Sequence, residues 1–124
     1  MGVLENQNRY QSSNKGKKKI RDWYASRTPD QVAARTEYMR AFREERLTFL
    51  NDLKIWCGCA DCGYRNHPEA LDFDHLPGFT KKCAIAVIRY GRMEVLLDEL
   101  SKCEVVCSNC HRVRTSQRRT NALD

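Results

Sequence analysis

The sequence predicts an α+β fold in which a long amphipathic helix precedes a small, stapled domain. Three observations indicate this class: a stretch of about two dozen residues without Gly or Pro, two short segments typical of β-strands, and two Cys-x-x-Cys pairs in a short chain. The stretch predicts the helix, the two segments predict a small sheet, and the cysteine pairs predict the staple.

The composition limits the chain to one domain with a small core. Its 124 residues are 41% hydrophobic and 31% charged, with a mean hydropathy of −0.70. The seven cysteines are an odd number and no apolar run resembles a signal sequence, so we expect reduced thiols in the cytoplasm. The longest apolar run, 83–88, is too short to cross a bilayer. A net charge of +6 favours a polyanionic partner such as nucleic acid.

Residues 1–19 are predicted to be a flexible basic arm. They are polar, with Ser, Asn and Gly followed by Lys17, Lys18 and Lys19. A solvated tail without a role explains the same composition equally well.

Residues 20–55 are predicted to be a helical region with one long helix. Thr28 can cap its start, Pro29 suits the first turn, and Gln31 completes a capping box. Apolar residues then fall roughly on one stripe as far as Lys54. Three arginines lie on or beside this stripe, where their stems can cover it while the charges stay in water: Arg35, Arg43 and Arg46. A solvated helix packed on the next module is the favoured interpretation, and a DNA contact from these arginines the less favoured one.

Residues 56–120 are predicted to form the α+β module. Turn residues, β-branched residues and apolar residues at helical spacing divide it into short elements. In chain order we expect a turn-rich knuckle, a strand, a loop, a helix, a second strand and a basic helix: 56–70, 71–76, 77–82, 92–102, 103–107 and 108–119.

The two Cys-x-x-Cys pairs predict a structural zinc site. Cys59 and Cys62 form one pair and Cys107 and Cys110 the other, and two such pairs supply the four thiolates of a tetrahedral site. A redox motif or chance buried cysteines are the alternatives for either pair taken alone. Closing the site would bring the first knuckle beside the start of the last helix. The remaining cysteines are a weaker substitute for Cys59 and two small core residues: Cys57, Cys83 and Cys103.

The strand ends in Asp74 and His75, and His111 directly follows the second pair. A carboxylate and an imidazole can share one divalent cation, and a second imidazole nearby can take a proton from an attacking water. Solvated or core histidines are the alternative for either one taken alone. Asp72 is expected to orient a ligand or to be a solvated acid, with a slight preference for the latter, and His67 to be a surface turn residue.

These residues resemble a known family. The segments "CADCGYRNHPEALDFDHLPG" and "KCEVVCSNCHRVRT" are similar to the HNH endonucleases, in the zinc-knuckle subtype of small bacterial and phage proteins. The resemblance covers about residues 57–119. It implies a ββα-metal (His-Me finger) module. It also implies a location in the cytoplasm of a bacterial cell or of a phage-infected host.

The resemblance also assigns roles. Asp74 and His111 would ligate the catalytic Mg²⁺ or Mn²⁺, and His75 would be the general base of a metal-dependent DNA endonuclease. The metal would steady the departing 3′ oxygen and leave a 5′-phosphate on the other product. The structural zinc would be held by the four cysteines and take no part in the reaction: Cys59, Cys62, Cys107 and Cys110.

One position departs from the family pattern. An asparagine often stands five residues before the third cysteine and braces the loop that bears the general base, whereas this chain has Lys102 there. Asn109 is the nearest asparagine. The departure keeps open a second interpretation, a catalytically silent zinc-stabilised DNA-binding module. A thiol oxidoreductase is disfavoured because no thioredoxin-like βαβ pattern surrounds either pair.

Duplex DNA is the expected partner, and a homodimer through the long helix is possible because one module presents a single active site. Six basic residues bracket the proposed site and are expected to contact backbone phosphates without reading sequence: Lys81, Lys82, Arg112, Arg114, Arg118 and Arg119. A helix end rich in solvated arginine is the alternative.

Overall fold

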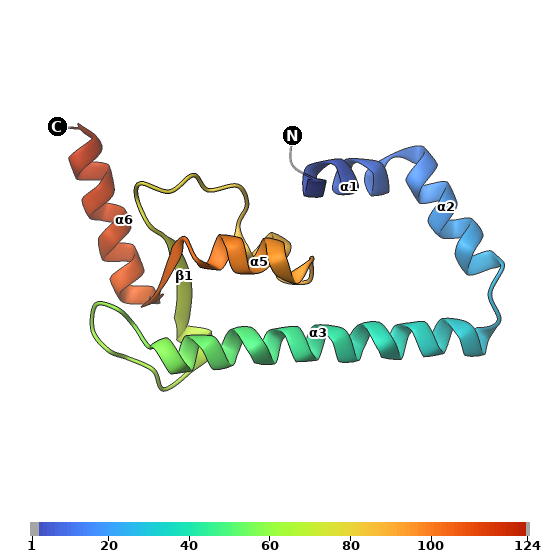
Figure 1. Ribbon diagram of the computed structural model, residues 1–124, viewed down its shortest axis with the longest axis horizontal. Coiled ribbons are helices and arrows are strands. Elements are labelled where there is room, and N and C mark those ends of the chain that lie inside the picture. The colour runs from blue at the N-terminus through green and yellow to red at the C-terminus, as the bar shows by residue number, and fades with distance from the viewer. Residues whose placement is uncertain (1–2, 124) are drawn as a thin grey trace. The chain divides into compact units, whose positions relative to one another are not determined.

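The computed structural model describes residues 3–123, with side chains described from 6 to 122. The chain divides between Phe42 and Arg43 into two compact units, which are treated separately below. Figure 1 shows the order of the elements along the chain.

The first unit contains α1 (Val3–Ser12), α2 (Asn14–Ala25) and the beginning of α3 (Pro29–Cys57). Ser13 separates the first two helices and caps α2, because its side chain accepts a hydrogen bond of 3.1 Å from the Gly16 N–H. The interpretation of residues 1–19 as a flexible arm assigned no helix to this segment, in which the structure has α1 and the start of α2.

The long helix begins where its sequence predicts. The Thr28 N–H donates to Gln31 Oε1 at 3.0 Å, and the Gln31 N–H donates to Thr28 Oγ1 at 3.2 Å. Both halves of the capping box are therefore formed, and this prediction is confirmed. Within the described residues, no helix is both long and apolar enough to cross a membrane.

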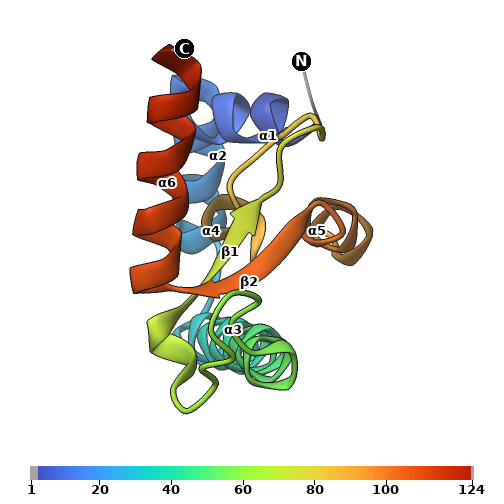
Figure 2. The ribbon, with the colours of Figure 1, turned by 90° about the vertical axis from the view of Figure 1, so that its left-hand side faces the viewer.

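The second unit is a mixed α+β module, as predicted (Figure 2). Strands β1 (Leu71–His75) and β2 (Cys103–Cys107) pair antiparallel, from Leu71 opposite Cys107 to His75 opposite Cys103. The other described elements of this unit are the rest of α3, a 3₁₀ turn and three further helices: η1 (Pro68–Ala70), α4 (Ile85–Ile88), α5 (Met93–Leu100) and α6 (Ser108–Leu123). The strand pair thus lies between the knuckle and α6 in the chain order expected.

The core of this unit is small and includes the cysteines. Leu71 and Val106, from the two strands, are fully buried and pack with Cys59, Val105 and Cys107. The arginine prediction for α3 is wrong at Arg46, which is buried and donates to the backbone carbonyls of Arg89 and Gly91 at 3.0 and 2.9 Å. This guanidinium satisfies the backbone at the end of α4 instead of pointing into water.

Candidate metal centre and acid–histidine site

The first knuckle turns sharply at a glycine. Gly63 has φ +79°, a left-handed conformation that glycine adopts without steric cost. This turn lets the Gly63 N–H donate to the Cys59 carbonyl at 2.8 Å, while the Cys62 N–H points at Cys59 Sγ over 3.5 Å. The first turn of α6 repeats the second contact, from the Cys110 N–H to Cys107 Sγ at 3.4 Å. In both pairs, therefore, a backbone N–H group points at the sulfur of the first cysteine and fixes the turn that carries the two thiols.

The pairing of β1 with β2 brings the two Cys-x-x-Cys pairs together. The four sulfur atoms all lie within 4.8 Å of one another, and those of Cys62 and Cys107 are 3.8 Å apart. Four sulfurs around zinc at about 2.3 Å are separated by about 3.8 Å in a regular tetrahedron. Among the side chains that the structure describes, this is the one group of three or more candidate metal ligands. The predicted metal cluster of four cysteines is confirmed, and its donors fit structural Zn²⁺.

The protein stabilises one of these sulfurs as a thiolate. Burial disfavours ionisation of Cys59, but hydrogen bonds from backbone N–H groups, those of Cys107 and Cys62 among them, outweigh it and lower its pKa to about 6. The Cys110 thiol has a pKa raised to about 12, chiefly because it shares a hydrogen bond with the Cys107 sulfur and because burial adds to the cost of its charge. Four adjacent sulfurs of this kind cannot all be charged without a cation among them.

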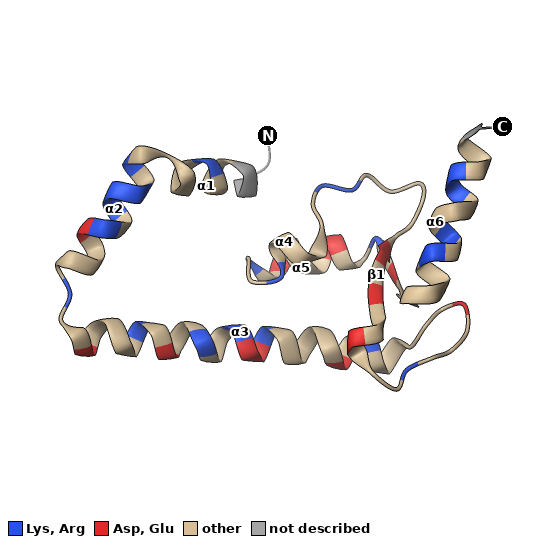
Figure 3. Ribbon diagram, turned by 180° about the vertical axis from the view of Figure 1, so that it is seen from behind, with Lys and Arg blue, Asp and Glu red and all other residues tan. Residues whose placement is uncertain are grey.

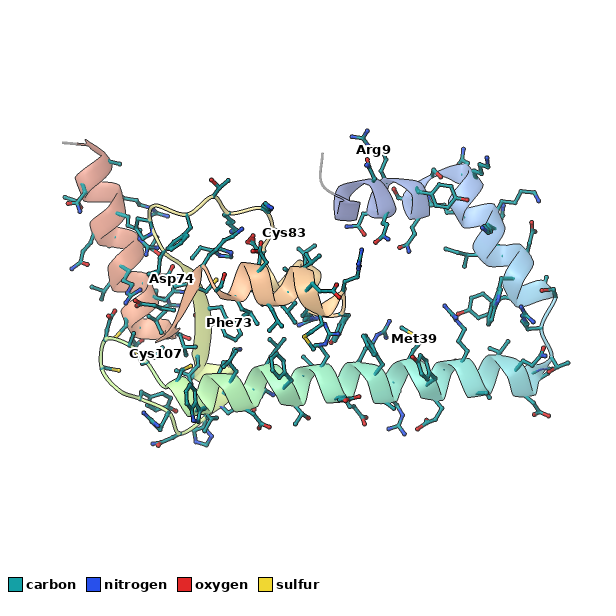
Figure 4. The ribbon with its side chains drawn as sticks, in the orientation of Figure 1. Arg9, Met39, Phe73, Asp74, Cys83 and Cys107 are labelled. Carbon is teal, nitrogen blue, oxygen red and sulfur yellow. The ribbon has the colours of Figure 1, made fainter. Side chains whose placement is uncertain are left out.

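Asp74 is the last residue but one of β1; it is buried, with 3% exposed, and faces α6 (Figure 4). Its Oδ1 accepts from Arg118 at 2.8 Å, and its Oδ2 accepts from Arg114 at 3.0 Å and Arg118 at 2.8 Å. Burial opposes the charge, yet hydrogen bonds from Arg118 and Arg114 hold the pKa of the carboxyl below its usual value. Asp74 is thus favoured as the ionised carboxylate at neutral pH.

Arg114 joins three parts of the module. Asp74 stands opposite Glu104 in the strand pair, an arrangement of like charges that is unfavourable by itself. Arg114 offsets it by donating to Asp74 at 3.0 Å and to Glu104 at 2.7 Å, and it also forms two bonds of 2.7 Å to Asp61. Because Asp61 lies between Cys59 and Cys62, this arginine ties α6 to the first knuckle.

His111 lies against both acids of the strand. Its Nδ1 is 3.1 Å from Asp72 Oδ2, and its Nε2 is 3.5 Å from Asp74 Oδ1. The structure therefore brings together the carboxylate and the imidazole that the sequence predicted to share a cation. Asp72, for which a solvated role was slightly preferred over an orienting one, contacts the imidazole of His111 while its side chain is 42% exposed, a position that fits both alternatives.

His75 has a partner that the sequence reasoning missed. Its Nε2 lies 3.2 Å from Oε2 of Glu99, a residue of α5 that is 1% exposed. The other oxygen of Glu99 accepts from Lys102 Nζ at 2.7 Å and from the Lys82 N–H at 3.1 Å. Glu99 follows the buried Leu96 at a spacing of three, so its place on the inner face of the predicted helix was the available signal.

A hollow of about 450 Å³ is lined by His75, His111 and Asp72. Three basic residues from separate segments line the same hollow: Lys54, Lys81 and Arg89. A second hollow, of about 540 Å³, shares Asp72 and His111 with the first and is also lined by Arg112 and Arg119 of α6. Figure 3 shows the basic residues along α6 and the acidic ones on β1.

The six predicted phosphate contacts therefore fall into two groups. Lys81, Arg112 and Arg119 line the hollows. Arg114 and Arg118 are engaged with carboxylates of the module, and Lys82 contributes its backbone N–H to Glu99.

No family model, curated protein or solved structure matches this chain.

Proposed function

We propose that the chain is a metal-dependent DNA endonuclease whose reactive groups lie at the end of β1 and the start of α6. One observation carries the proposal: His75 and His111 line one hollow, and the Nε2 atom of His111 lies 3.5 Å from Asp74 Oδ1. A candidate base and a candidate pair of metal ligands thus belong to one small site edged by cations.

Asp74 and His111 are the residues that would hold the catalytic metal. A carboxylate oxygen and a neutral imidazole nitrogen are both ligands of Mg²⁺ or Mn²⁺, and donors at right angles on a metal at about 2.1 Å stand about 3 Å apart. The separation of 3.5 Å between these two atoms is close to that value. A bound divalent ion would neutralise charge on the phosphate and on the departing oxygen.

His75 would act as the general base. With Nε2 turned to Glu99, its Nδ1 atom is the nitrogen that can take a proton from water. The water oxygen then bonds to phosphorus as the bond from phosphorus to the 3′ oxygen breaks. The products are a 5′-phosphate and, after the 3′ oxygen takes a proton from solvent, a 3′-hydroxyl.

The basic residues that line the hollows would hold the DNA backbone. They come from separate segments and line two hollows that share His111, which suits contact with phosphates of a duplex. The proposed contacts are Lys81, Arg112 and Arg119, with Lys54 and Arg89 added by the hollow.

Zinc at the four cysteines would have a structural role. The cluster ties the first knuckle to the start of α6, and His111 follows Cys110 directly. Zinc would therefore fix the position of His111 relative to Asp74 without touching the reacting phosphate.

A second candidate is a catalytically silent zinc module that binds DNA. It is favoured by the two guanidinium groups on Asp74, because Arg114 and Arg118 together engage both carboxylate oxygens. A divalent ion would have to displace at least one of these hydrogen bonds. On this alternative Asp74 is a structural anchor for α6 and not a metal ligand.

Plasmid cleavage with Mg²⁺ or Mn²⁺ distinguishes the two candidates. The endonuclease proposal expects supercoiled plasmid to be nicked or linearised by the wild type and not by His75→Ala or His111→Ala, with all three proteins shifting DNA on a gel. If the zinc-loaded wild type shifts DNA but does not cut with either metal, the silent module is the better account. His67→Ala, a histidine outside both hollows, is the matched control.

A further inference from the structure

We propose that Glu99 and Lys102 are positioning residues that fix the tautomer and orientation of His75. This inference rests on the proposed endonuclease function and assigns it two residues that do not touch the substrate. It is carried by a buried network of hydrogen bonds between α5 and the segments that follow β1.

Glu99 is the centre of this network. Its side chain is 2% exposed, and a carboxylate so deeply buried requires partners for both oxygens. Oε2 is 3.2 Å from His75 Nε2, while Oε1 accepts from Lys102 Nζ and from the Lys82 N–H. Hydrogen bonds from Lys102 and Lys82 outweigh the effect of burial, so the pKa of Glu99 lies below its usual value and the group is an acceptor at neutral pH.

An acceptor at this place selects one form of the neutral imidazole. The two nitrogens of a neutral imidazole differ, since one carries the proton and the other a lone pair. Because ionised Glu99 can only accept, it favours the proton on Nε2 and leaves the lone pair on Nδ1. No hydrogen bond to Nδ1 is found among the described residues, so that nitrogen remains available to a water in the hollow that His75 lines.

Lys102 connects Glu99 to the loop that follows His75. Its Nζ donates to the Thr80 carbonyl at 3.0 Å as well as to Glu99 at 2.7 Å, and its backbone carbonyl accepts from the Leu76 N–H at 2.9 Å. The side chain therefore links α5 to the segment between Leu76 and Lys82. Lys102 therefore braces this loop through two contacts and joins it to Glu99 through a third, at the position where the HNH pattern often has asparagine.

The first test is the tautomer of His75 in the full-length, zinc-loaded wild type. Long-range ¹H–¹⁵N spectra at alkaline pH, where imidazoles are neutral, distinguish the two tautomers. The proposal expects the proton on Nε2 of His75. A proton on Nδ1 would overturn it, whatever the variants show.

The second test compares Glu99→Gln with Glu99→Leu. A glutamine has one acceptor oxygen, and two donors, Lys102 Nζ and the Lys82 N–H, already point at the Oε1 position. Its carbonyl therefore belongs there and its NH2 group donates to Nε2 of His75, so we expect the proton of His75 to move to Nδ1 and plasmid cleavage to be lost. Leucine removes the acceptor, so we expect a mixture of tautomers and a kcat lowered by about 100-fold, as for a misplaced catalytic group, with KM for DNA unchanged. Glu94→Gln, an exposed glutamate on the same helix, is the control and should change neither readout.

The outcomes separate this inference from the function on which it rests. A wild type that does not cut DNA contradicts the endonuclease proposal, whereas a cutting wild type with the Nδ1–H tautomer contradicts only the positioning role. A folded Glu99→Leu that keeps both the tautomer and the rate also overturns the positioning role. If that variant does not fold, the wild-type tautomer together with Glu99→Gln decides.

Discussion

The two ends of the β1–β2 pair differ in the partners that their buried polar groups have. At the end where Leu71 faces Cys107, four sulfur atoms have mainly one another as neighbours. At the end where His75 faces Cys103, the buried acids have cationic partners within the chain. The first is the cysteine end and the second the acid–histidine end.

We expect the structure of the cysteine end, and not that of the acid–histidine end, to depend on a bound metal ion. The hydrogen bonds that the described residues make to sulfurs at the cysteine end come from backbone N–H groups and from the sulfurs themselves, so we expect the geometry of this end to depend on a bound ion. The acid–histidine end has its buried charges paired by arginine and lysine, so its side chains are held before any divalent ion binds. Loss of zinc from the cysteine cluster should therefore unfold the module, while removal of the proposed catalytic metal should leave it folded.

Removal of a zinc ligand should have the largest effect. Cys107→Ser deletes one of four sulfurs in the core, and structural zinc in small domains contributes about 10–16 kcal/mol of apparent binding energy to folding. We expect loss of helical circular dichroism, precipitation and less than one zinc per chain by elemental analysis. Cys57→Ser, an exposed cysteine outside the cluster, is the control. A well-folded, zinc-free Cys107→Ser protein would contradict the requirement for metal at the cysteine end.

Arg114→Ala tests the pairing at the acid–histidine end. The change leaves Asp74 with Arg118 alone and restores the repulsion between Asp74 and Glu104, at a cost of about 3 kcal/mol. Urea unfolding of the zinc-loaded protein measures this cost. Arg112→Ala on the same helix should change the free energy of unfolding little. Equal stability of the two variants would mean that this end is not held by its ion pairs.

The Glu99 carboxylate predicts a dependence of stability on pH. Burial opposes its charge, but Lys102, the Lys82 N–H and His75 keep its folded pKa below the ordinary value of 4.5. The contribution of the ionised group is therefore complete above 4.5 and is lost as the pH falls through the folded pKa. Glu99→Gln should cost about 1.5 kcal/mol near neutrality, and the difference from wild type in urea unfolding should shrink in acid. A difference that grows in acid would reverse the assigned charge state.

Thr28→Ala should have the smallest effect and leave both ends unchanged. The threonine caps α3 within the first unit, and loss of such a cap costs about 1 kcal/mol of helix stability. Thermal melting followed by circular dichroism measures it, with the exposed Thr36→Ala inside α3 as control. Zinc content and plasmid cleavage should equal those of wild type, and a change in either would contradict a purely local role.

The sequence predicted those parts of the module whose signals are local. The capping box at Thr28, the two strands and the helix that begins at Ser108 follow from residue spacing over a few positions. The cysteine cluster was also predictable, because two identical pairs imply one metal wherever the chain places them.

The charge network was not predictable in the same way. Glu99 meets His75 across 24 residues, and Arg114 reaches Asp74 across 40, so no short pattern joins them. Arg118 was expected to face DNA phosphates, but the buried carboxylate of Asp74 lies nearer and engages its guanidinium. A buried acid on a strand requires a partner such as a cation. The arginines of the basic helix that follows the second strand were therefore the available signal for the partners of Asp74.

The most direct test of this account is made on His75→Ala, with zinc content, thermal stability and plasmid cleavage measured on one preparation. We predict one zinc per chain, because the cysteine end is unchanged, and a lowered but still cooperative melting transition, because Oε2 of the buried Glu99 loses its partner. Cleavage should fall by about 10²–10⁴-fold. Cleavage at the wild-type rate would contradict the role of His75, and loss of zinc together with cleavage would contradict the separation of the two ends.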